Sequence, residues 1–370
     1  MKSYSAVHSF SLLDPEYTSP LGDISILDPL SDTRWSDFIE RHPHATVFHS
    51  PGWLEALRRT YDYKPLVVTT SPANEPLSNG MVLCKVRSWI TGSRLVAVPF
   101  ADHCEPLVNN ERELELLITY LRAQLKRDPK SYLELRPLRA LGSDLAQRSE
   151  LGEDRSYYIH QLDLTPDVHQ LHRAFHKSCV QGKIRKAERE GLLYEEGRSE
   201  ELMAKFYKLL LRTRRRQQLP PQPMTWFRNL SICLGKRFKV RVVSKNGRPI
   251  ASIITIRFGH TEVYKYGCSD DYYHNMGGMA LLIWSAVQDA KASGARSFDF
   301  GRCERKNEGL ATFKEHWGST KGQLSYYRFP AGTNSDAQSG WKMRLIKGSC
   351  SYLPDSLLAR LGAALYKHVG

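Results

Sequence analysis

One order of predicted elements occurs twice along this chain of 370 residues, and it limits the fold more than any other feature. In the first half, apolar stretches bounded by turn residues predict three strands, at 65–70, 80–86 and 94–100. A helix over 111–127 follows, with leucines at three- and four-residue spacing, and then a short strand at 131–136. This half therefore reads as an antiparallel meander followed by a helix and a further strand.

The second half repeats this order. Strands are predicted at 238–244, 249–258 and 261–267, and Asn246 with Gly247 suits a hairpin turn because both residues tolerate positive φ. A helix from Gly277 to about Lys291 leads to a buried strand at 297–300, parallel to its predecessor. The two halves share no residue-level repeat. Another α+β fold that shares five elements by chance is the alternative to a true architectural repeat.

Three antiparallel strands, a helix and a further strand resemble the core of the GNAT acetyltransferase fold. We therefore expect an α+β (α/β) chain of two tandem GNAT-like domains, each a mixed, mainly antiparallel sheet flanked by helices. The expected boundaries are a loosely ordered segment 1–30, an N-terminal domain 31–164, a C-terminal domain 165–330, and a linker with an amphipathic helix over 331–370. The second domain opens on a basic helical lead-in, for which Thr165 is the expected N-cap and Gly191 the end.

Composition excludes several classes of protein. No stretch approaches about 18 uncharged apolar residues, so no transmembrane helix is predicted, and the start lacks the order of a secretion signal. The seven cysteines form no C-x-x-C pair and the 13 histidines no H-E-x-x-H set, which argues against a metal site and fits reduced thiols. The absence of G-x-S-x-G argues against a hydrolase. We expect a cytoplasmic protein without a bound metal.

The formal charge of +14 is concentrated in two blocks, within 183–189 and 212–216. Such blocks attract phosphate-bearing partners, namely nucleotides, tRNA or an anionic membrane leaflet. A solvated helix face is the alternative. A peripheral position at the inner face of the membrane is left open by the same charge and by the C-terminal amphipathic helix.

The junction from loop to helix at 275–280 is a candidate donor site. A helix N-terminus rich in small residues leaves N–H groups free for a phosphate or pyrophosphate. In GNAT enzymes this place holds the pyrophosphate of coenzyme A through Arg/Gln-x-x-Gly-x-Gly/Ala. Here Gly278 and Ala280 agree with that pattern while Asn275 departs from it, and Gly277 lies between them. Packing alone is the alternative explanation for the two glycines.

A second polar segment, F-D-F-G-R over 298–302, is followed by E-G-L-x-x-F-K-x-x-W-G over 308–318. Asp299 lies in an apolar strand, so it needs a buried partner, and Arg302 or Lys314 is expected to supply it. Alternatively, Lys314 points toward a phosphate or a developing oxyanion.

These two motifs resemble the C-terminal signature of FemAB-like proteins, in particular the CelD-like branch linked to exosortase and exopolysaccharide systems. The segments His49-Ser50-Pro51-x-Trp53-Leu54, I-R-K-A-E-R-x-G over 184–191 and F-Y-x4-R-T-R-R-R over 206–216 add to the resemblance, which covers about 45–330. It implies transfer of an acetyl or aminoacyl group from acyl-CoA or aminoacyl-tRNA to an amine of a cell-envelope or saccharide precursor, with no tightly bound cofactor. The chain lacks the long inserted coiled-coil arm of some peptidoglycan members, which weakens the tRNA interpretation.

The expected roles follow from these motifs and the resemblance. Candidate catalytic residues are Lys314, Asp102, Asp299 and Tyr266; candidate donor-binding residues are Asn275, Gly277, Gly278 and Ala280; candidate substrate-binding residues are Arg302, Trp317, Arg185 and Arg212. Direct attack of the amine on the thioester or ester is expected, with a carboxylate, tyrosine or water accepting the proton. The rival hypothesis is a non-catalytic accessory protein of an envelope or exopolysaccharide system that binds anionic partners.

Overall fold

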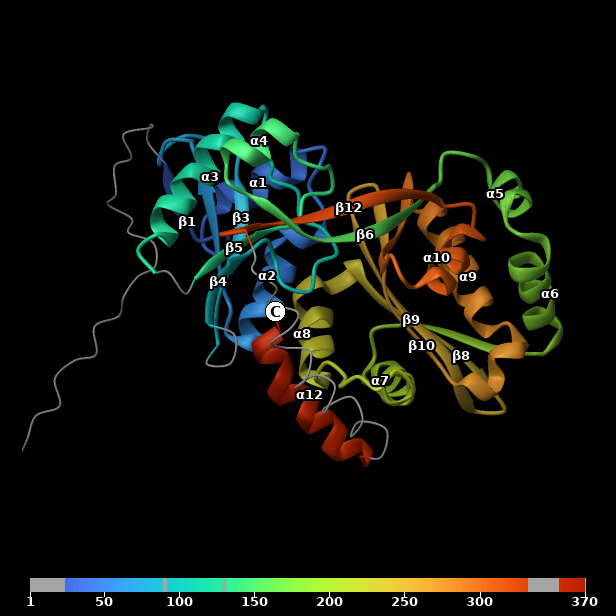
Figure 1. Cartoon of the computed structure of the whole chain (residues 1–370). Helices are drawn as coiled ribbons and strands as arrows, with labels where there is room; N and C mark the ends of the chain where they lie inside the picture. Colours follow the sequence, from blue (N-terminus) through green and yellow to red (C-terminus); the bar gives the residue numbers. More distant parts are fainter. Residues whose placement is uncertain (1–23, 89–91, 129–130, 332–352, 370) are drawn as a thin grey trace, which may run out of the picture.

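The computed structural model describes residues 24–88, 92–128, 131–331 and 353–369, and within them twelve strands form one sheet. Their order across the sheet is β1-β2-β3-β4-β5-β12-β6-β11-β10-β9-β8-β7 (Figure 1). The strands are β1 Ser25–Leu27, β2 Lys64–Thr69, β3 Met81–Ser88, β4 Gly92–Val96, β5 Tyr132–Leu135, β6 Gly152–Asp163, β7 Leu193–Gly197, β8 Phe238–Lys245, β9 Arg248–Phe258, β10 Thr261–Ser269, β11 Ser297–Glu304 and β12 Thr320–Phe329.

The repeated order of elements is confirmed in both halves. Strands β2, β3 and β4 form an antiparallel meander, and β4 pairs parallel with β5 across the helix α3 (Glu111–Leu125). Strands β8, β9 and β10 do the same, and β10 pairs parallel with β11 across α9 (Gly278–Ala292). The expected α+β architecture of two similar halves is therefore present.

Two long strands that the sequence analysis leaves unassigned join the halves. Strand β6 ends the first half but pairs with β11 of the second, whereas β12 ends the second half and pairs with β5 of the first. The two strands also pair with each other over most of their length, from Gly152↔Arg328 to Gln161↔Thr320. In Figure 1 they cross the middle of the molecule side by side. This exchange makes one continuous sheet and fixes the loop after β4 against β10 and β11.

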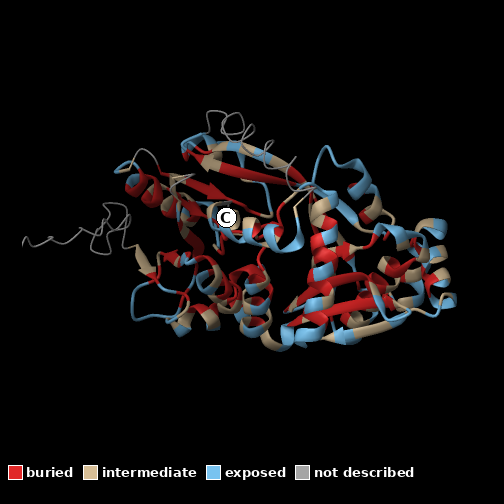
Figure 2. Cartoon of the chain, turned by 90° about the horizontal axis from the view of Figure 1, so that it is seen from below, coloured by how far each residue is buried: buried red, intermediate tan, exposed pale blue. Residues whose placement is uncertain are grey.

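Helices cover both faces of the sheet. They are α1 Thr33–Arg41, α2 Pro51–Tyr61, α3, α4 Ser143–Arg148, α5 Val168–Ala174, α6 Gly182–Arg189, α7 Glu200–Arg216, α8 Met224–Leu234, α9, α10 Glu308–Glu315 and α12 Asp355–Val369. In the second half, α7 packs with Val240, Val242 and Ile254, whereas α9 packs with Val243 and Ile253. Because side chains alternate along a strand, α7 and α9 lie on opposite faces. Figure 2 shows buried residues following the strands through both halves.

The lead-in to the second half is not one long helix. It is divided into α5, a π-helical turn η2 (Lys177–Gln181) and α6. The N-cap is Asp167 rather than Thr165, because Asp167 and Gln170 form a capping box in which each side chain accepts the other's backbone N–H. The expected end at Gly191 is confirmed by its φ of 63° just beyond α6.

The C-terminal helix α12 packs on the body of the molecule. Leu358 is fully buried, and the Tyr63 hydroxyl donates to the carbonyls of Tyr366 and Lys367, both at 3.1 Å. None of the helices in the described ranges is long and apolar enough to cross a membrane. The expected linker over 331–340, apart from residue 331, and most of the segment 1–30 lie outside the described residues.

The motif that begins at His49 has a structural explanation. Ser50 is the N-cap of α2 and accepts the N–H of Trp53 at 3.3 Å, and Pro51 occupies the first helical position. Fully buried His49 accepts the N–H of Thr46 on Nδ1 at 3.0 Å and donates from Nε2 to the Glu105 carbonyl at 2.9 Å. This pairing holds the ring neutral and ties the first half's helices to the loop after β4.

We predict that His49 makes the protein acid-sensitive. Burial lowers the pKa of its imidazole from 6.5 to about 4. Between these pH values the imidazole is therefore protonated in the unfolded chain and neutral in the folded chain. Stability is therefore lost as the pH falls from about 6.5 to 4, by up to about 3 kcal/mol from this residue. Urea unfolding across this range should show a steeper loss for the native protein than for His49→Gln, whose amide keeps both hydrogen bonds without titrating. Equal slopes would contradict the prediction.

Candidate active site

The centre of the site is the place where β10 and β11 part. Their parallel pairing covers three residue pairs, from Thr261↔Ser297 to Val263↔Asp299, although both strands continue beyond it. Immediately after the last pair, the register of β10 against β9 shifts between Tyr264 and Tyr266, which leaves Lys265 as a bulge residue. A β-bulge at the point where two strands separate leaves backbone groups unpaired and changes the direction of nearby side chains. The two strands thus open a gap in the sheet at Val263 and Asp299.

Asp102, from the loop after β4, reaches this gap from the first half. Lys265 Nζ donates to Asp102 Oδ2 at 2.8 Å, and both side chains are largely buried. Burial alone would raise the pKa of Asp102, but the charges of Lys265, Arg302 and Lys314 outweigh it and lower that pKa. Burial likewise lowers the pKa of the Lys265 amine. The charges around Asp102 therefore favour its ionised form, and its hydrogen bond with Lys265 binds the two halves together at the gap.

A second bulge, in β11, brings this strand against Asp102. The pairing of β11 with β6 shifts between Asp299 and Arg302, and Gly301 adopts a φ of 70°. A Cβ at Gly301 would lie 3.0 Å from Asp102 Oδ2. Tyr326 on β12 donates its hydroxyl to the Asp102 carbonyl at 2.6 Å and receives a hydrogen bond from Arg302, also at 2.6 Å. Glycine at 301 is thus required both by the backbone and by the approach of the carboxylate.

Asp299 has a different partner from the two expected. Its Oδ2 lies 3.1 Å from Nε2 of His103, and its Oδ1 accepts the N–H of Gly301 at 2.7 Å. Arg302 instead turns toward Tyr326 and Asp102, and Lys314 donates to backbone carbonyls. The expectation of an Arg302 or Lys314 partner is wrong because the fold places His103, 196 residues away in sequence, directly beside the carboxylate.

His103 is a functional candidate that the sequence analysis missed. It is 2% exposed, and its Nδ1 has no hydrogen-bond partner among the described residues. A carboxylate that accepts the Nε2 proton leaves the lone pair on Nδ1 free, which is the arrangement of a general base. The signal available in the sequence was its position directly after Asp102 in a polar loop that follows a strand.

A cavity of about 130 Å³ adjoins this pair. Its lining includes His103 and Asp299, together with Val263 of β10 and Phe48 and Thr46 of the first half. Val263 and Asp299 are the last paired residues before the strands part, so the cavity reaches the gap. It has room for several water molecules or for the end of an amine-bearing chain.

Lys314 supports the gap from α10. It is 2% exposed and donates to the carbonyls of Gly301 and Arg302, at 2.7 and 2.9 Å. Burial lowers the pKa of its amine, while the nearby Asp102 carboxylate opposes that shift. Its direct contacts hold the β11 bulge in place.

The four donor-loop candidates lie together at the start of α9. No side chain caps this helix, and Gly277 is its N-cap, with a φ of 77°. The Lys183 carbonyl of α6 lies where a Cβ of Gly277 would stand, so the basic helix packs directly on the loop. Gly278 and Ala280 are buried, whereas Asn275 is exposed. The loop thus presents an uncapped helix N-terminus beside exposed basic residues of α6.

The remaining candidates make contacts outside the Asp102–Lys265 and His103–Asp299 pairs. Tyr266 is buried and accepts a hydrogen bond from Trp226 Nε1 at 2.8 Å, and burial raises its pKa, which disfavours a role as a base. Trp317 is fully buried against Phe175, and Arg185 is exposed on α6. Arg212 on α7 pairs with buried Asp270, which directly follows β10.

We predict that Gly301→Ala abolishes most activity and destabilises the fold, because it adds left-handed strain of about 1–2 kcal/mol and displaces Asp102. Gly294→Ala is the matched control, since its φ is 80° but nothing lies within 4 Å of the added Cβ. Both variants should lose stability in urea unfolding, and Gly301→Ala alone should lose turnover. Equal activity in the two variants would contradict the role assigned to this contact.

Comparison with known proteins agrees with this architecture. Residues 174–315 match the family described as Acetyltransferase (GNAT) domain. The structure of FemX is similar to this chain with a TM-score of 0.64 at 14% identity, over 79% of this chain and 95% of that one. L-PGS from Bacillus licheniformis gives 0.54 at 13%, over 88% and 98% of the two chains. A tandem GNAT protein from the clavulanic acid biosynthesis pathway gives 0.53 at 11%, over 85% and 100%.

The chain therefore carries a GNAT acetyltransferase domain within a tandem GNAT fold. No curated protein sequence matches it significantly. The likenesses to solved structures are too low in identity to establish more than the fold. The expected connection with exopolysaccharide systems has no support among them.

Proposed function

We propose that this protein is an N-acyltransferase that moves an acetyl or aminoacyl group from an acyl-CoA or an aminoacyl-tRNA to a primary amine of a cell-envelope or saccharide precursor. The observation that carries the proposal is the parting of β10 and β11 beside the buried groups Asp102, Lys265, Asp299 and His103. A gap in a sheet has room for an extended acyl donor. The buried polar groups at the gap can supply acid–base chemistry, which the fold itself does not require.

The two substrates approach from opposite sides of the gap. The phosphates of the donor lie at the uncapped start of α9, beside the exposed basic residues of α6, and its acyl carbonyl reaches the bulge at Lys265. The amine enters the cavity on the other side, next to His103. Its nitrogen attacks the carbonyl carbon, the bond to sulfur or to the ribose oxygen breaks, and His103 Nδ1 accepts the proton of the amine. Asp299 orients His103 and stabilises its charged form.

The sharpest test of the donor loop is Asn275→Glu. Gly278→Asp is unsuitable because a side chain there meets Ile250 and Ala251 in the core. Asn275 is exposed, so glutamate adds charge without disturbing packing. Two like charges about 4 Å apart repel by about 1 kcal/mol in water, so we expect the affinity for a pyrophosphate-bearing donor to fall about fivefold. A negative charge near a helix N-terminus should leave thermal stability unchanged or slightly raised.

The measurement is calorimetry with acetyl-CoA, a longer acyl-CoA and a charged tRNA, each at two salt concentrations. His169→Glu, at another exposed position in the first turn of α5, is the matched charge control. Saturable binding that Asn275→Glu weakens and His169→Glu does not would support the donor site. Binding of tRNA that requires the attached amino acid would identify the aminoacyl donor. No binding of any donor would favour the non-catalytic accessory protein instead.

A further inference from the structure

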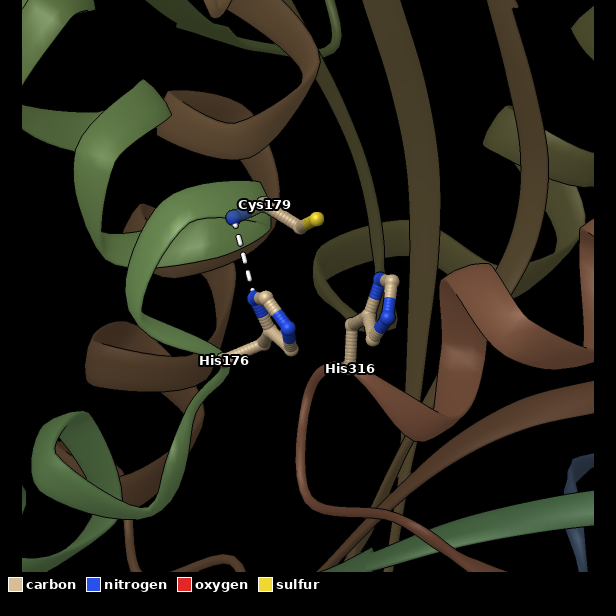
Figure 3. Close-up of side chains that lie close together, drawn as sticks. All are labelled: His176, Cys179 and His316. Atoms are coloured by element: carbon tan, nitrogen blue, oxygen red, sulfur yellow. Dashed lines mark hydrogen bonds between the residues drawn. The ribbon is translucent and has the colours of Figure 1, made fainter.

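His176, Cys179 and His316 come together on the surface of the second half (Figure 3). His176 caps η2, Cys179 lies within this turn, and His316 follows the end of α10. A ring nitrogen of each histidine and the sulfur of Cys179 lie within 4.8 Å of one another. Spacing along the chain predicts no metal site here, because His316 lies far from His176 and Cys179 in sequence.

The core behind these residues fixes their backbones. Phe175 and Trp317, the neighbours of His176 and His316, are buried and pack edge to face with ring centroids 5.1 Å apart. The N–H of His176 also donates to the His316 carbonyl at 2.8 Å. The two histidines are thus held side by side, with ring centroids 4.3 Å apart, before any ligand binds. Such prior ordering lowers the cost of assembling a binding site.

Each of the three side chains has a nitrogen or sulfur atom available to bind a ligand. His316 makes no side-chain hydrogen bond within the described part of the chain, and the Cys179 thiol has a weak contact with Ser178 Oγ at 3.8 Å. His176 Nδ1 accepts the N–H of Cys179 at 3.1 Å, the bond dashed in Figure 3, so its Nε2 is the available nitrogen. His176 is exposed and the other two residues are half-buried, which gives an ion access from solvent.

We infer that His176, Cys179 and His316 bind one transition metal ion of the Zn²⁺ type, with water as the fourth ligand. Two imidazoles and a thiolate suit Zn²⁺ and disfavour Mg²⁺ and Ca²⁺, which prefer oxygen ligands. Tetrahedral Zn²⁺ with bonds of about 2.0–2.3 Å separates its ligand atoms by about 3.3–3.6 Å. Rotations of the three side chains, within segments that the core already holds together, close the remaining distance.

Binding changes the local protonation in a defined way. The thiol of Cys179 releases its proton, and the proton on Nε2 of His176 moves to Nδ1, where Ser178 Oγ lies 3.4 Å away as an acceptor. The N–H of Cys179 then loses its present acceptor. Metal binding is therefore expected to weaken as the pH falls, because protons compete for all three ligands.

The ion would fasten two distant segments, namely η2 and the turn between α10 and β12. Because α6 follows η2 directly and its Lys183 carbonyl packs on Gly277, the ion also steadies the basic helix beside the start of α9. This is a structural site, and it stands independently of the proposed transferase activity.

The test uses the full chain after treatment with a chelator, titrated with Co²⁺ and Zn²⁺. We expect one ion per chain, ligand-field bands of tetrahedral Co²⁺ and a thiolate charge-transfer band. Cys179→Ser should abolish that band, whereas Cys233→Ser, which changes another half-buried cysteine, should retain it. His316→Gln should weaken Zn²⁺ binding by more than about 100-fold, the upper end of what loss of an outer-shell partner costs. His169→Gln should leave binding unchanged.

Alkylation of the native chain provides a readout that needs no variant. Zn²⁺ should slow the labelling of Cys179 at least tenfold and leave that of Cys233 unchanged, as measured by peptide mass spectrometry. Absence of a stoichiometric ion, or binding that persists in both Cys179→Ser and His316→Gln, would overturn the inference and indicate an adventitious ion only.

Discussion

Asp299→Asn is expected to lower turnover by about 10²- to 10⁴-fold while leaving donor affinity unchanged. The substitution is isosteric, and the carbonyl oxygen of the new amide can still accept the Gly301 N–H. Its NH₂ group, however, donates to His103 Nε2, so the ring proton moves to Nδ1 and the base is lost. A general base contributes about this factor to a transfer reaction. The readout is single-turnover transfer from the donor that calorimetry identifies, with unfolding measured in parallel.

His103→Gln provides the companion variant. It removes the base directly, so it should reduce turnover by a similar factor, and the double variant should be little worse than either single one. Losses that multiply in the double variant would indicate that the two residues act separately. Native turnover in both single variants would contradict the assignment of the His103–Asp299 pair as the proton acceptor.

Asp102→Asn is expected to destabilise the fold by about 3–5 kcal/mol. It leaves the Lys265 ammonium, 6% exposed, without its direct anionic partner, and removing one member of a buried ion pair costs about this much. The Phe48 and Trp53 rings, 5.1 and 5.7 Å from Lys265 Nζ, reduce the penalty without replacing the carboxylate. Urea unfolding at neutral pH measures the change in the free energy of unfolding.

The matched control is a double-mutant cycle with Lys265→Met. Methionine keeps the contact with the aromatic rings and removes the buried charge, so the double variant should recover at least half of the stability lost in Asp102→Asn. Additive losses in the cycle would mean that the two residues do not stabilise each other. Activity should stay low in the double variant, because Asp102 also shapes the gap beside Gly301.

The sequence pattern predicts those parts of the fold in which elements adjacent in sequence also pack together. Hairpins such as β8–β9 and crossovers such as β10–α9–β11 carry turn residues and apolar periodicity within a few dozen residues. Strands β6 and β12 pair with strands from the other half of the chain, so no turn residues or nearby strands in the sequence indicate their pairing. Both are also rich in polar and charged residues, which conceals their central position in the sheet.

In the candidate site, too, the sequence indicates single residues but not the contacts between residues that are distant in sequence. The sequence indicates that Asp102, Asp299 and Lys314 have a special role, because burying a charged group in or beside an apolar strand is costly unless it has a partner. Their contacts are non-local: Asp102 meets Lys265, 163 residues away, and Asp299 meets His103. Arg302 and Lys314 were predicted as partners of Asp299 because they are near in sequence, and the bulge at Gly301 directs both elsewhere.

Hydrogen–deuterium exchange of the full chain, with and without acetyl-CoA and with and without a charged tRNA, tests whether the donor binds between β10 and β11. We expect one of these donors to slow exchange at two places together, the β10 bulge at 264–267 and the first turn of α9 from Gly278. Removing the acyl group should reduce the effect at the bulge. Protection confined to the exposed basic faces of α6 and α7, indifferent to the acyl group, would contradict a donor site between β10 and β11.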